Sequence, residues 1–207
     1  MLAEKKQDIR KLSLQELEAY FLSVGEKKFR AKQVYEWLWN KSMKNFDEMS
    51  NISKSTREIL KENFTINHIL VDQFQRSTDG TIKNAVKLYD NNIVESVLIP
   101  TSKRITACVS SQVGCSLDCN FCATARLKRM RNLNPDEIYD QVVAIQEEAS
   151  LYFDRPLTNI VFMGMGEPLL NYQNVLSAIE KICSPEGLGI SPKRITLSTV
   201  GIGKTGR

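Results

Sequence analysis

The chain has 207 residues, of which 42% are hydrophobic and 25% are charged, and its formal net charge is +4 at pH 7. This length allows one hydrophobic core, or one core with a small appended module. No stretch approaches the roughly 18 apolar residues of a membrane helix, and the N-terminus has no apolar signal core, so we expect a cytoplasmic protein without a membrane partner. The mild positive charge permits a nucleic-acid partner but does not require one.

The first third of the chain predicts a small helical module. Ser13-Leu14-Gln15-Glu16 is a capping box, and the helix that it opens ends at Gly25. A second helix is expected over residues 31–41. A third is expected to open at another capping box, Ser55-Thr56-Arg57-Glu58, and to reach about Asn63. No strand pattern interrupts these helices, so we expect residues 1–65 to form one helical accessory domain.

The pattern then changes to the period of two that is typical of strands. Residues 66–76 and 81–89 flank Asp79-Gly80, a strong hairpin signal. Asn91-Asn92 marks a second turn before a third strand over residues 93–99, and Pro100 is expected to end the sheet. We therefore expect residues 66–100 to form a β-hairpin extension.

From Arg104 onward, predicted strands and helices alternate. Strands are expected over residues 104–109, 159–163 and 194–199, and helices over 135–149 and 174–182. Alternating β and α units favour a parallel sheet or barrel. Three such strands are too few for a closed barrel. The predicted fold class is therefore α/β, with residues 101–207 forming the N-terminal part of a (βα) barrel after the helical module and the hairpin extension.

Three of the five cysteines lie within eight residues. Cys115-Ser-Leu-Asp-Cys119-Asn-Phe-Cys122 has the spacing C-x3-C-x-aromatic-C and follows the first predicted barrel strand, where barrel enzymes carry their chemistry. Three thiolates can bind three irons of a [4Fe–4S] cluster and leave the fourth iron open for a ligand. A structural zinc site would use four ligands, and Cys183 is distant on a predicted helix. A zinc knuckle or unrelated buried cysteines are the alternatives.

A second loop signal follows the next predicted strand, at Gly164-Met165-Gly166-Glu167-Pro168. Glycines let the backbone approach a ligand, and Glu167 can accept hydrogen bonds from an ammonium group. Alone, this segment is about equally consistent with a plain turn. One βα unit after the cysteine motif, it resembles the motif with which radical S-adenosylmethionine (SAM) enzymes hold the methionine end of that cofactor.

Several blocks carry a closer resemblance and together cover nearly the whole chain. They are Phe29–Gln33, Phe46–Met49, Cys108–Cys115, Arg131–Leu133, Gly164–Asn171 and Arg194–Gly201. In these blocks the chain resembles the bacterial dual-specificity RNA methyltransferases, radical SAM enzymes that methylate carbon 2 of adenine in 23S rRNA and in some tRNAs. The block from Cys108 to Cys115 is the most distinctive.

The resemblance implies cofactors and partners. The cofactors are a [4Fe–4S] cluster held by Cys115, Cys119 and Cys122, and SAM, whose contacts match Gly166, Glu167 and Ser198. The partners are 23S rRNA and tRNA, which the helical domain of residues 1–65 would bind, and an external electron donor such as flavodoxin. The protein would act as a monomer.

The resemblance also implies a mechanism with two SAM molecules. One methylates a cysteine near the C-terminus of the enzyme, and the radical from the second activates that methyl group for addition to adenine. A disulfide then releases the product. Cys108 matches the second cysteine of that disulfide, and Glu95 matches the proton acceptor.

Two features depart from the family. None of the five cysteines matches the methyl-carrying position, which would lie beyond Arg207, and Gly203–Arg207 does not look like the family's continuation after Gly201. The simplest interpretation is a truncated gene or an incomplete chain. We expect the chain by itself not to methylate RNA.

Strand patterns leave two of these roles open. Thr106, Cys108 and Ser110 share the polar face that a barrel turns inward, although a free cysteine is most often a small buried hydrophobe. Glu95 shares a strand face with apolar residues at positions 93, 97 and 99, so partial desolvation would suit proton transfer. A charge that protects an edge strand from aggregation explains Glu95 equally well.

Two basic segments complete the list of candidates. They are Arg126, Lys128, Arg129 and Arg131 after the cysteines, and Lys27, Lys28, Arg30 and Lys32 around the second helix. Contacts with phosphate are one reading, and a solvated charged face is favoured for most of them. An RNA adenine methyltransferase is the leading hypothesis. Another radical SAM enzyme and a non-catalytic RNA-binding remnant with an Fe–S or zinc centre are the alternatives.

Overall fold

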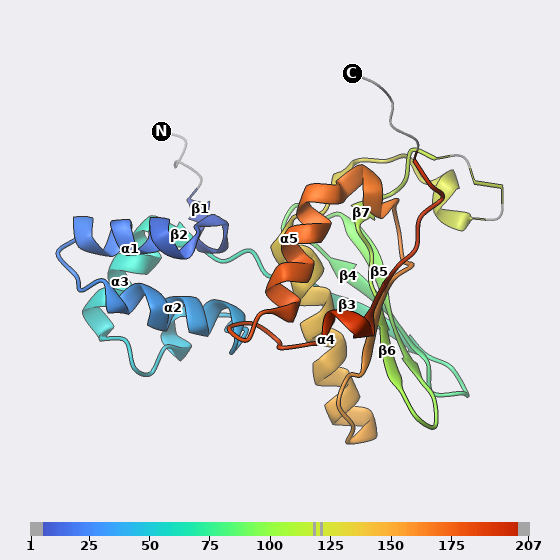
Figure 1. The fold of residues 1–207 in the computed structure, drawn as a ribbon, viewed down its shortest axis with the longest axis horizontal. Coiled ribbons are helices and arrows are strands. Elements are labelled where there is room, and N and C mark those ends of the chain that lie inside the picture. Colours follow the sequence, from blue (N-terminus) through green and yellow to red (C-terminus); the bar gives the residue numbers. More distant parts are fainter. Residues whose placement is uncertain (1–5, 118, 121, 203–207) are drawn as a thin grey trace. The chain divides into compact units, whose positions relative to one another are not determined.

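The computed structural model describes residues 6–117, 119–120 and 122–202, which group into two compact units (Figure 1). The first unit extends to His68 and includes Ser184–Leu188, and the second comprises Ile69–Cys183 and the residues from Gly189 onward. Phe121 of the cysteine motif and the unusual ending Gly203–Arg207 lie outside the described residues. Among the described residues, no helix is long and apolar enough to cross a membrane.

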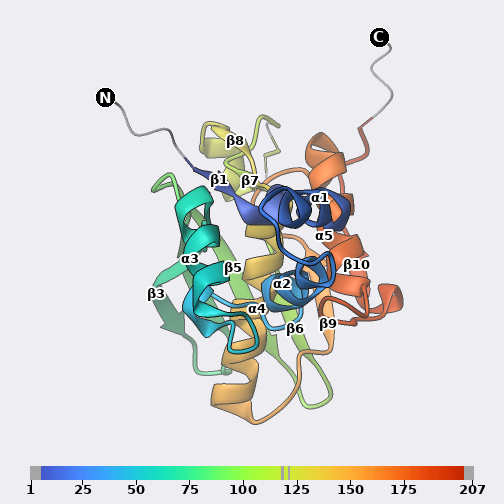
Figure 2. The same cartoon turned by 90° about the vertical axis from the view of Figure 1, so that its left-hand side faces the viewer.

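The first unit contains the three expected helices (Figure 2). They are α1 (Leu14–Ser23), α2 (Phe29–Trp39) and α3 (Lys54–Asn63). Short 3-10 helices lie at Ile9–Lys11 and Phe46–Glu48. The helices bury one apolar side each, and the side chains that meet in the core include Leu17, Phe21, Val34, Leu38 and Leu60. The helical module is therefore held together by its own small core.

The helix starts differ in two places from the sequence prediction: α2, expected over residues 31–41, begins at Phe29, and α3 also begins early. The capping box of Ser13 and Glu16 is confirmed, but α3 begins two residues earlier than expected, because the hydroxyl of Ser53 accepts the backbone N–H of Thr56. The first unit also contains strands, contrary to expectation. The two-residue strands β1 (Gln7–Asp8) and β2 (Phe64–Thr65) pair in parallel. Two-residue strands are too short to show a period in the sequence.

The second unit is built on a six-stranded sheet with the order β10-β9-β6-β5-β4-β3. The strands are β3 (Leu70–Arg76), β4 (Ile82–Lys87), β5 (Ile93–Pro100), β6 (Ile105–Cys108), β9 (Asn159–Phe162) and β10 (Ile195–Leu197). From β3 to β6 neighbouring strands are antiparallel, whereas β6, β9 and β10 are parallel. Pro100 does not end the sheet, because it is the last residue of β5 and pairs with Ile105.

The predicted hairpin strands and the predicted barrel strands thus form one continuous sheet. Across the junction, Val97 of β5 pairs with Cys108 of β6, and Cys108 pairs with Val161 of β9. Two helices form the crossovers between the parallel strands, α4 (Pro135–Phe153) and α5 (Tyr172–Cys183). The parallel βα units agree with an α/β fold and a partial barrel.

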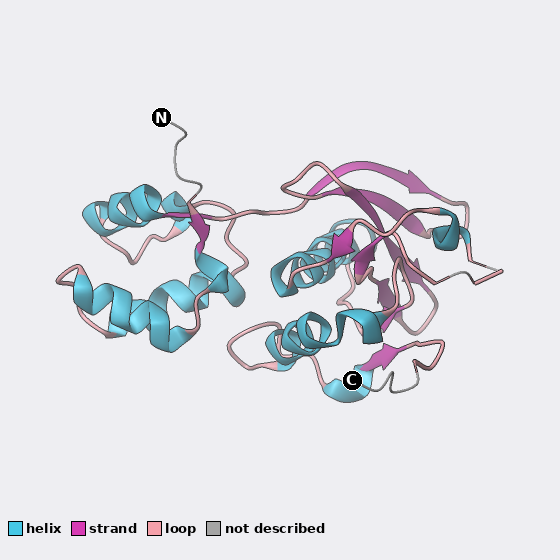
Figure 3. Ribbon diagram, turned by 90° about the horizontal axis from the view of Figure 1, so that it is seen from above, coloured by secondary structure: helices cyan, strands magenta, loops and turns pink. Residues whose placement is uncertain are grey.

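The two faces of the sheet differ in burial. Helices α4 and α5 pack against each other, and α4 lies against β5 and β6 (Figure 3). The sheet residues that face this core are apolar and include Val94, Leu98, Ile105, Ala107, Ile160 and Phe162. On the opposite face, Lys83, Glu95, Ile99 and Thr196 are exposed. Helix packing therefore fixes one face of the sheet and leaves the other open to solvent.

Candidate functional site

The three motif cysteines lie in one loop, residues 114–128, which we call the cysteine loop. Strands β7 (Gln112–Val113) and β8 (Arg131–Asn132) pair at its base, and the N–H of Met130 donates to the carbonyl of Val113 at 2.9 Å. Gly114 has a φ of +71°, and a Cβ on it would overlap the carbonyl of Lys128. Only glycine lets the two sides of the loop approach this closely.

Cys115, Cys119 and Cys122 are free and partly buried. The N–H of Cys122 donates to the carbonyl of Cys119 at 2.9 Å, so these two cysteines share one turn. Among the residues that the structure describes, no group of three or more His, Cys, Asp or Glu side chains is arranged to hold a metal ion. The type and number of donors nevertheless fit a [4Fe–4S] cluster with one open iron, because three soft thiols come from one loop.

The second motif forms a turn at residues 164–168, which we call the glycine turn, and it is bonded directly to the start of the cysteine loop. The carbonyl of Met165 accepts the N–H groups of Ser111 at 2.8 Å and Gln112 at 3.1 Å. The N–H of Met165 donates to the hydroxyl of Ser110 at 2.8 Å, and the N–H of Glu167 donates to the side-chain oxygen of Gln112 at 2.9 Å. The two motifs are therefore one hydrogen-bonded assembly.

The glycines of this turn serve that assembly. A Cβ on Gly164 would lie 2.7 Å from the hydroxyl of Ser110, and a Cβ on Gly166 would lie 2.5 Å from the Cβ of Gln112. Gly166 also has a φ of +97°, which favours glycine. In this structure the space that glycine leaves is filled by the neighbouring strand end. The sequence interpretation had assigned that space to a ligand.

Glu167 is buried, and both of its carboxylate oxygens accept backbone N–H groups. Oε1 accepts from Leu169 at 2.9 Å, and Oε2 accepts from Val200 at 3.0 Å. The second bond brings the segment after β10, which includes the exposed Ser198, to the glycine turn. A carboxylate has about four lone-pair sites, so Glu167 can still accept from an ammonium group. The cysteine loop, the glycine turn and Ser198 all follow the C-terminal ends of parallel strands.

Cys108 ends β6 on the side of the sheet opposite α4. The predicted alternation is confirmed, since Ile105, Ala107 and Val109 are buried and Cys108 is only partly so. Burial raises the pKa of the Cys108 thiol, and a hydrogen bond with the backbone of Met163 opposes that rise. Cys108 is thus a protonated thiol at neutral pH, with part of its surface accessible.

Glu95 does not have the environment that the sequence suggested. Its side chain is 52% exposed, and Nζ of Lys83 lies 3.0 Å from its Oε1. The expected partial desolvation is therefore wrong in this structure. The edge-strand explanation is wrong as well, because β5 lies between β4 and β6. Both faces of β5 carry apolar residues, so the sequence alone could not tell which face packs against the helices.

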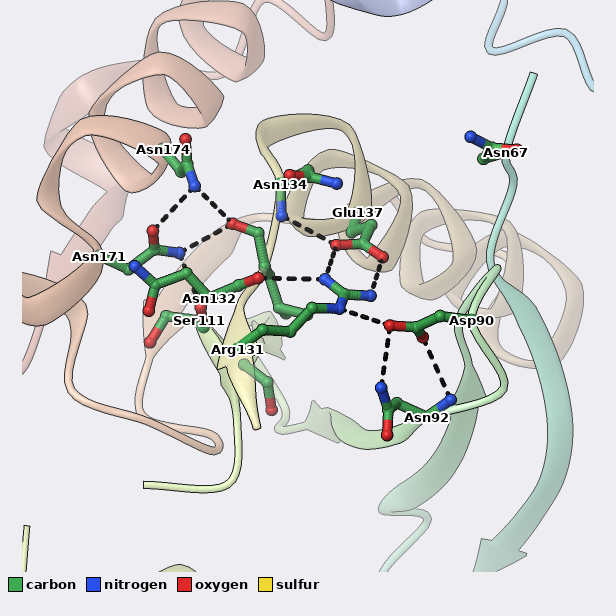
Figure 4. Close-up of polar contacts among 12 residues, drawn as sticks. Asn67, Asp90, Asn92, Ser111, Arg131, Asn132, Asn134, Glu137, Asn171 and Asn174 are labelled. Atoms are coloured by element: carbon green, nitrogen blue, oxygen red, sulfur yellow. Dashed lines mark hydrogen bonds and ion pairs between the residues drawn. The ribbon is translucent and has the colours of Figure 1, made fainter. Parts of the chain in front are cut away.

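Arg131 was a candidate phosphate contact, but its guanidinium is bound within the protein (Figure 4). Nη1 and Nη2 each lie 2.7 Å from an oxygen of Glu137, and Nε lies 2.6 Å from Asp90. The hydrogen bond from Arg131 lowers the pKa of Asp90 to about 2. The guanidinium also stacks over Tyr89 at 5.1 Å. Arg131 therefore fastens the end of the cysteine loop to α4 and to the β4–β5 turn.

Asparagines add further ties at the same place (Figure 4). The side-chain nitrogen of Asn171 donates to the carbonyls of Ser111 at 2.8 Å and Leu133 at 2.9 Å, and Asn174 donates to Leu133 at 2.9 Å. Sequence reasoning missed Asp90, Gln112, Glu137 and Asn171. The spacing of Asn134 and Glu137 is a helix-start signal that could have located Glu137, since its carboxylate accepts the N–H of Asn134.

Comparisons with known proteins agree with this arrangement. Residues 7–66 match the family described as the ribosomal RNA large subunit methyltransferase N-terminal domain, and residues 109–204 match the radical SAM superfamily. A probable dual-specificity RNA methyltransferase RlmN of Christiangramia forsetii is 71% identical over 97% of this chain and 57% of its own length. A dual-specificity RNA methyltransferase RlmN of Geotalea uraniireducens is 43% identical over 96% of this chain and 56% of its own length.

A solved structure supports the same assignment. The crystal structure of a radical SAM methyltransferase from Sphaerobacter thermophilus aligns with a TM-score of 0.84 and 35% identity, over 95% of this chain and 57% of that one. The chain thus spans a little over half the length of the curated relatives that it matches. On the combined evidence of both family matches, these relatives and the shared fold, the chain belongs to the dual-specificity RNA methyltransferase family of the radical SAM superfamily.

Proposed function

We propose that this chain is the cluster-binding and SAM-binding part of a methyltransferase that acts on carbon 2 of adenine in 23S rRNA and tRNA. The observation that carries the proposal is the direct bonding of the cysteine loop to the glycine turn through Met165 and Gln112. This assembly lies where three parallel strands end, the usual place for ligands in α/β folds. The family membership supplies the reaction and the RNA substrates.

Cys115, Cys119 and Cys122 would hold the [4Fe–4S] cluster that radical SAM enzymes use. When bound, the cluster supplies the electron that cleaves the sulfonium bond of SAM and yields a 5′-deoxyadenosyl radical. Glu167, fixed by the N–H groups of Leu169 and Val200, would accept the ammonium group of SAM. The backbone of Gly166 and the exposed Ser198 would complete the contacts with the cofactor.

Cys108 and Glu95 would act on the open face of the sheet. Val97 pairs with Cys108 across β5 and β6, and Glu95 lies two residues from Val97 on the same face. These neighbours would be the proton acceptor, Glu95, and the thiol that closes a disulfide, Cys108. All five cysteines are free in the structure, so the disulfide rests on the family alone.

The remaining parts of the proposal concern partners. The helical unit would contact RNA, since residues 7–66 match the N-terminal domain of an rRNA methyltransferase family. Exposed basic residues near its second helix, such as Lys27 and Lys32, would contact phosphates. An external electron donor such as flavodoxin would reduce the cluster, and the protein would work as a monomer.

Anaerobic reconstitution with iron and sulfide tests the cluster assignment. We expect about four irons per chain and the broad absorbance of a thiolate-bound Fe–S cluster at about 400 nm. Alanine at Cys115, Cys119 or Cys122 should abolish that absorbance, whereas the matched control Cys183→Ala should keep it. A colourless protein with one bound zinc would refute the assignment and favour the non-catalytic alternative.

Transfer of tritium from methyl-labelled SAM tests the reaction. The assay compares this chain with a chimera that is extended, to the length of the relatives, by residues of the Christiangramia protein, on 23S rRNA fragments and tRNA. We expect label at carbon 2 of adenine with the chimera and none with the chain alone. Cleavage of SAM to 5′-deoxyadenosine by the chimera without label in either RNA would favour another radical SAM reaction.

A further inference from the structure

Gln112 lies between the two motifs and is fully buried. Its side-chain oxygen accepts the N–H of Glu167 at 2.9 Å, and its side-chain nitrogen donates to Oδ1 of Asn132 at 2.7 Å. Its backbone N–H donates to the carbonyl of Met165 at 3.1 Å. Gln112 therefore makes two hydrogen bonds to the glycine turn and one to Asn132 of β8, the strand that closes the base of the cysteine loop.

Steric contact adds to these bonds. A Cβ on Gly166 would lie 2.5 Å from the Cβ and 2.6 Å from the Cγ of Gln112, so the turn rests directly on the aliphatic part of this side chain. On the other side, Gln112 pairs with Asn132 in the β7–β8 ladder, and Nδ2 of Asn132 donates to the carbonyl of Leu170 at 3.2 Å. The position of the turn is thus set by contacts that start three residues before Cys115.

An amide suits this place because it is a donor and an acceptor at once. An ionised carboxylate could accept from Glu167 but could not donate to Asn132, and an apolar side chain could do neither. Because the side chain is fully buried, water cannot replace a lost partner at low cost. Any shorter or apolar substitute would leave the N–H of Glu167 without its acceptor.

On the basis of the proposed function, we infer that Gln112 is a positioning residue that fixes the glycine turn relative to the cysteine loop. It thereby holds the SAM-binding atoms of Gly166 and Glu167 at the distance from the cluster that SAM must span. Gln112 touches neither the reacting atoms nor the cysteine thiols. Its substitution should therefore weaken SAM binding and leave the cluster assembled.

The test compares Gln112→Leu and Gln112→Glu with the wild-type chain and with the control Gln141→Leu. Gln141 is also a fully buried amide, but its bonds go to the backbone of Ser110 and Glu137 and none reaches the glycine turn. After anaerobic reconstitution, we would measure iron and sulfide, the Kd of SAM, and the change that SAM causes in the electron paramagnetic resonance spectrum of the reduced cluster.

We expect wild-type iron content in all variants. The Kd of SAM should rise about tenfold or more in Gln112→Leu, the equivalent of about one buried hydrogen bond, and stay near the wild-type value in Gln141→Leu. The spectral change on adding SAM should be lost only at position 112. If Gln112→Leu does not fold, Gln112→Glu carries the test: it keeps the size of the side chain but cannot donate to Asn132, so the Kd of SAM should rise in this variant as well.

Two results would overturn the positioning role while leaving the proposed function intact. One is an unchanged Kd for SAM in the position-112 variants, and the other is an equal rise in Gln141→Leu, which would mean that core packing alone is responsible. A wild-type chain that assembles no cluster or binds no SAM would overturn the proposed function and the role of Gln112 together.

Discussion

Removing the Arg131 guanidinium should destabilise the second unit by about 3–5 kcal/mol, the usual cost of stranding one partner of a buried ion pair. In Arg131→Met, the aliphatic part of the side chain is kept and the charge is lost. The side chain of Glu137 is only 1% exposed, and both of its oxygens would lose a charged donor at 2.7 Å. Without that donor, the Glu137 carboxylate remains buried, and no charged partner offsets the free energy of its desolvation.

Asp90 should contribute less to this loss. Its side chain is 25% exposed, so water can solvate it once Arg131 is gone, and partly exposed ion pairs contribute about 1 kcal/mol or less. The double variant Arg131→Met with Glu137→Gln should therefore recover roughly 2 kcal/mol relative to the single variant. The glutamine removes the buried charge and keeps an acceptor for the N–H of Asn134.

Urea denaturation followed by far-ultraviolet circular dichroism measures both effects. Both tryptophans, Trp37 and Trp39, lie in the helical unit, so intrinsic fluorescence would report on the wrong part of the chain. A loss below about 1 kcal/mol in Arg131→Met, or a double variant no more stable than the single one, would refute the reasoning.

Three further predictions concern single groups. Arg131 lowers the pKa of Asp90 from 3.8 to about 2. The stability that this ion pair contributes, about 1 kcal/mol because Asp90 is partly exposed, should be complete above about pH 4 and lost as the pH falls through about 2. Urea unfolding across that range should show a slope that Asp90→Asn flattens, and an unchanged slope would contradict it. Gly166→Ala should lower the free energy of unfolding by about 3 kcal/mol, because alanine would have to adopt a positive φ and would overlap Gln112. The control Gly189→Ala has a φ of +65° but open space around it, and should lower it by about 1 kcal/mol. Equal losses of stability in thermal unfolding would count against the close contact. Since burial raises the pKa of Cys108, its alkylation by iodoacetamide, followed by mass spectrometry, should still accelerate above about pH 9, and a plateau below that pH would be inconsistent with a buried thiol.

Elements with a strong local signal could be predicted from the sequence. The capping box at Ser13, the Asp79-Gly80 turn and the alternation around Cys108 depend on neighbouring residues only, and each is confirmed. The position of the cysteine motif after a strand is confirmed for the same reason. Gly80 takes the φ of +87° that such a turn requires.

Features that depend on tertiary packing could not be predicted. The exposure of Glu95 follows from which face of β5 meets α4, and both faces are apolar enough to do so. The pairing of Arg131 with Asp90 joins residues 41 positions apart, which no local pattern records. Gln112 reads as an ordinary polar residue in the sequence, and only the folded chain shows that its amide joins two loops.

The change of strand direction at β6 has a consequence for the order of folding. On one side, β6 pairs with β5 across a connection of a few residues, so the antiparallel strands β3 to β6 close through short loops. On the other side, its parallel partner β9 begins only after the cysteine loop and α4. Long loops close at a higher entropic cost, and contacts distant in the chain form more slowly.

The antiparallel part of the sheet should therefore be the early-forming template, and β9 and β10 should join it later. The base of the cysteine loop lies inside the slow crossover, and the glycine turn follows β9. In pulsed hydrogen exchange during refolding, amides of β4 and β5 should gain protection before those of β9. In a chain that is still folding, the thiols of Cys115, Cys119 and Cys122 would thus be exposed beside an incomplete sheet. The glycine turn would bond to the base of the cysteine loop only later.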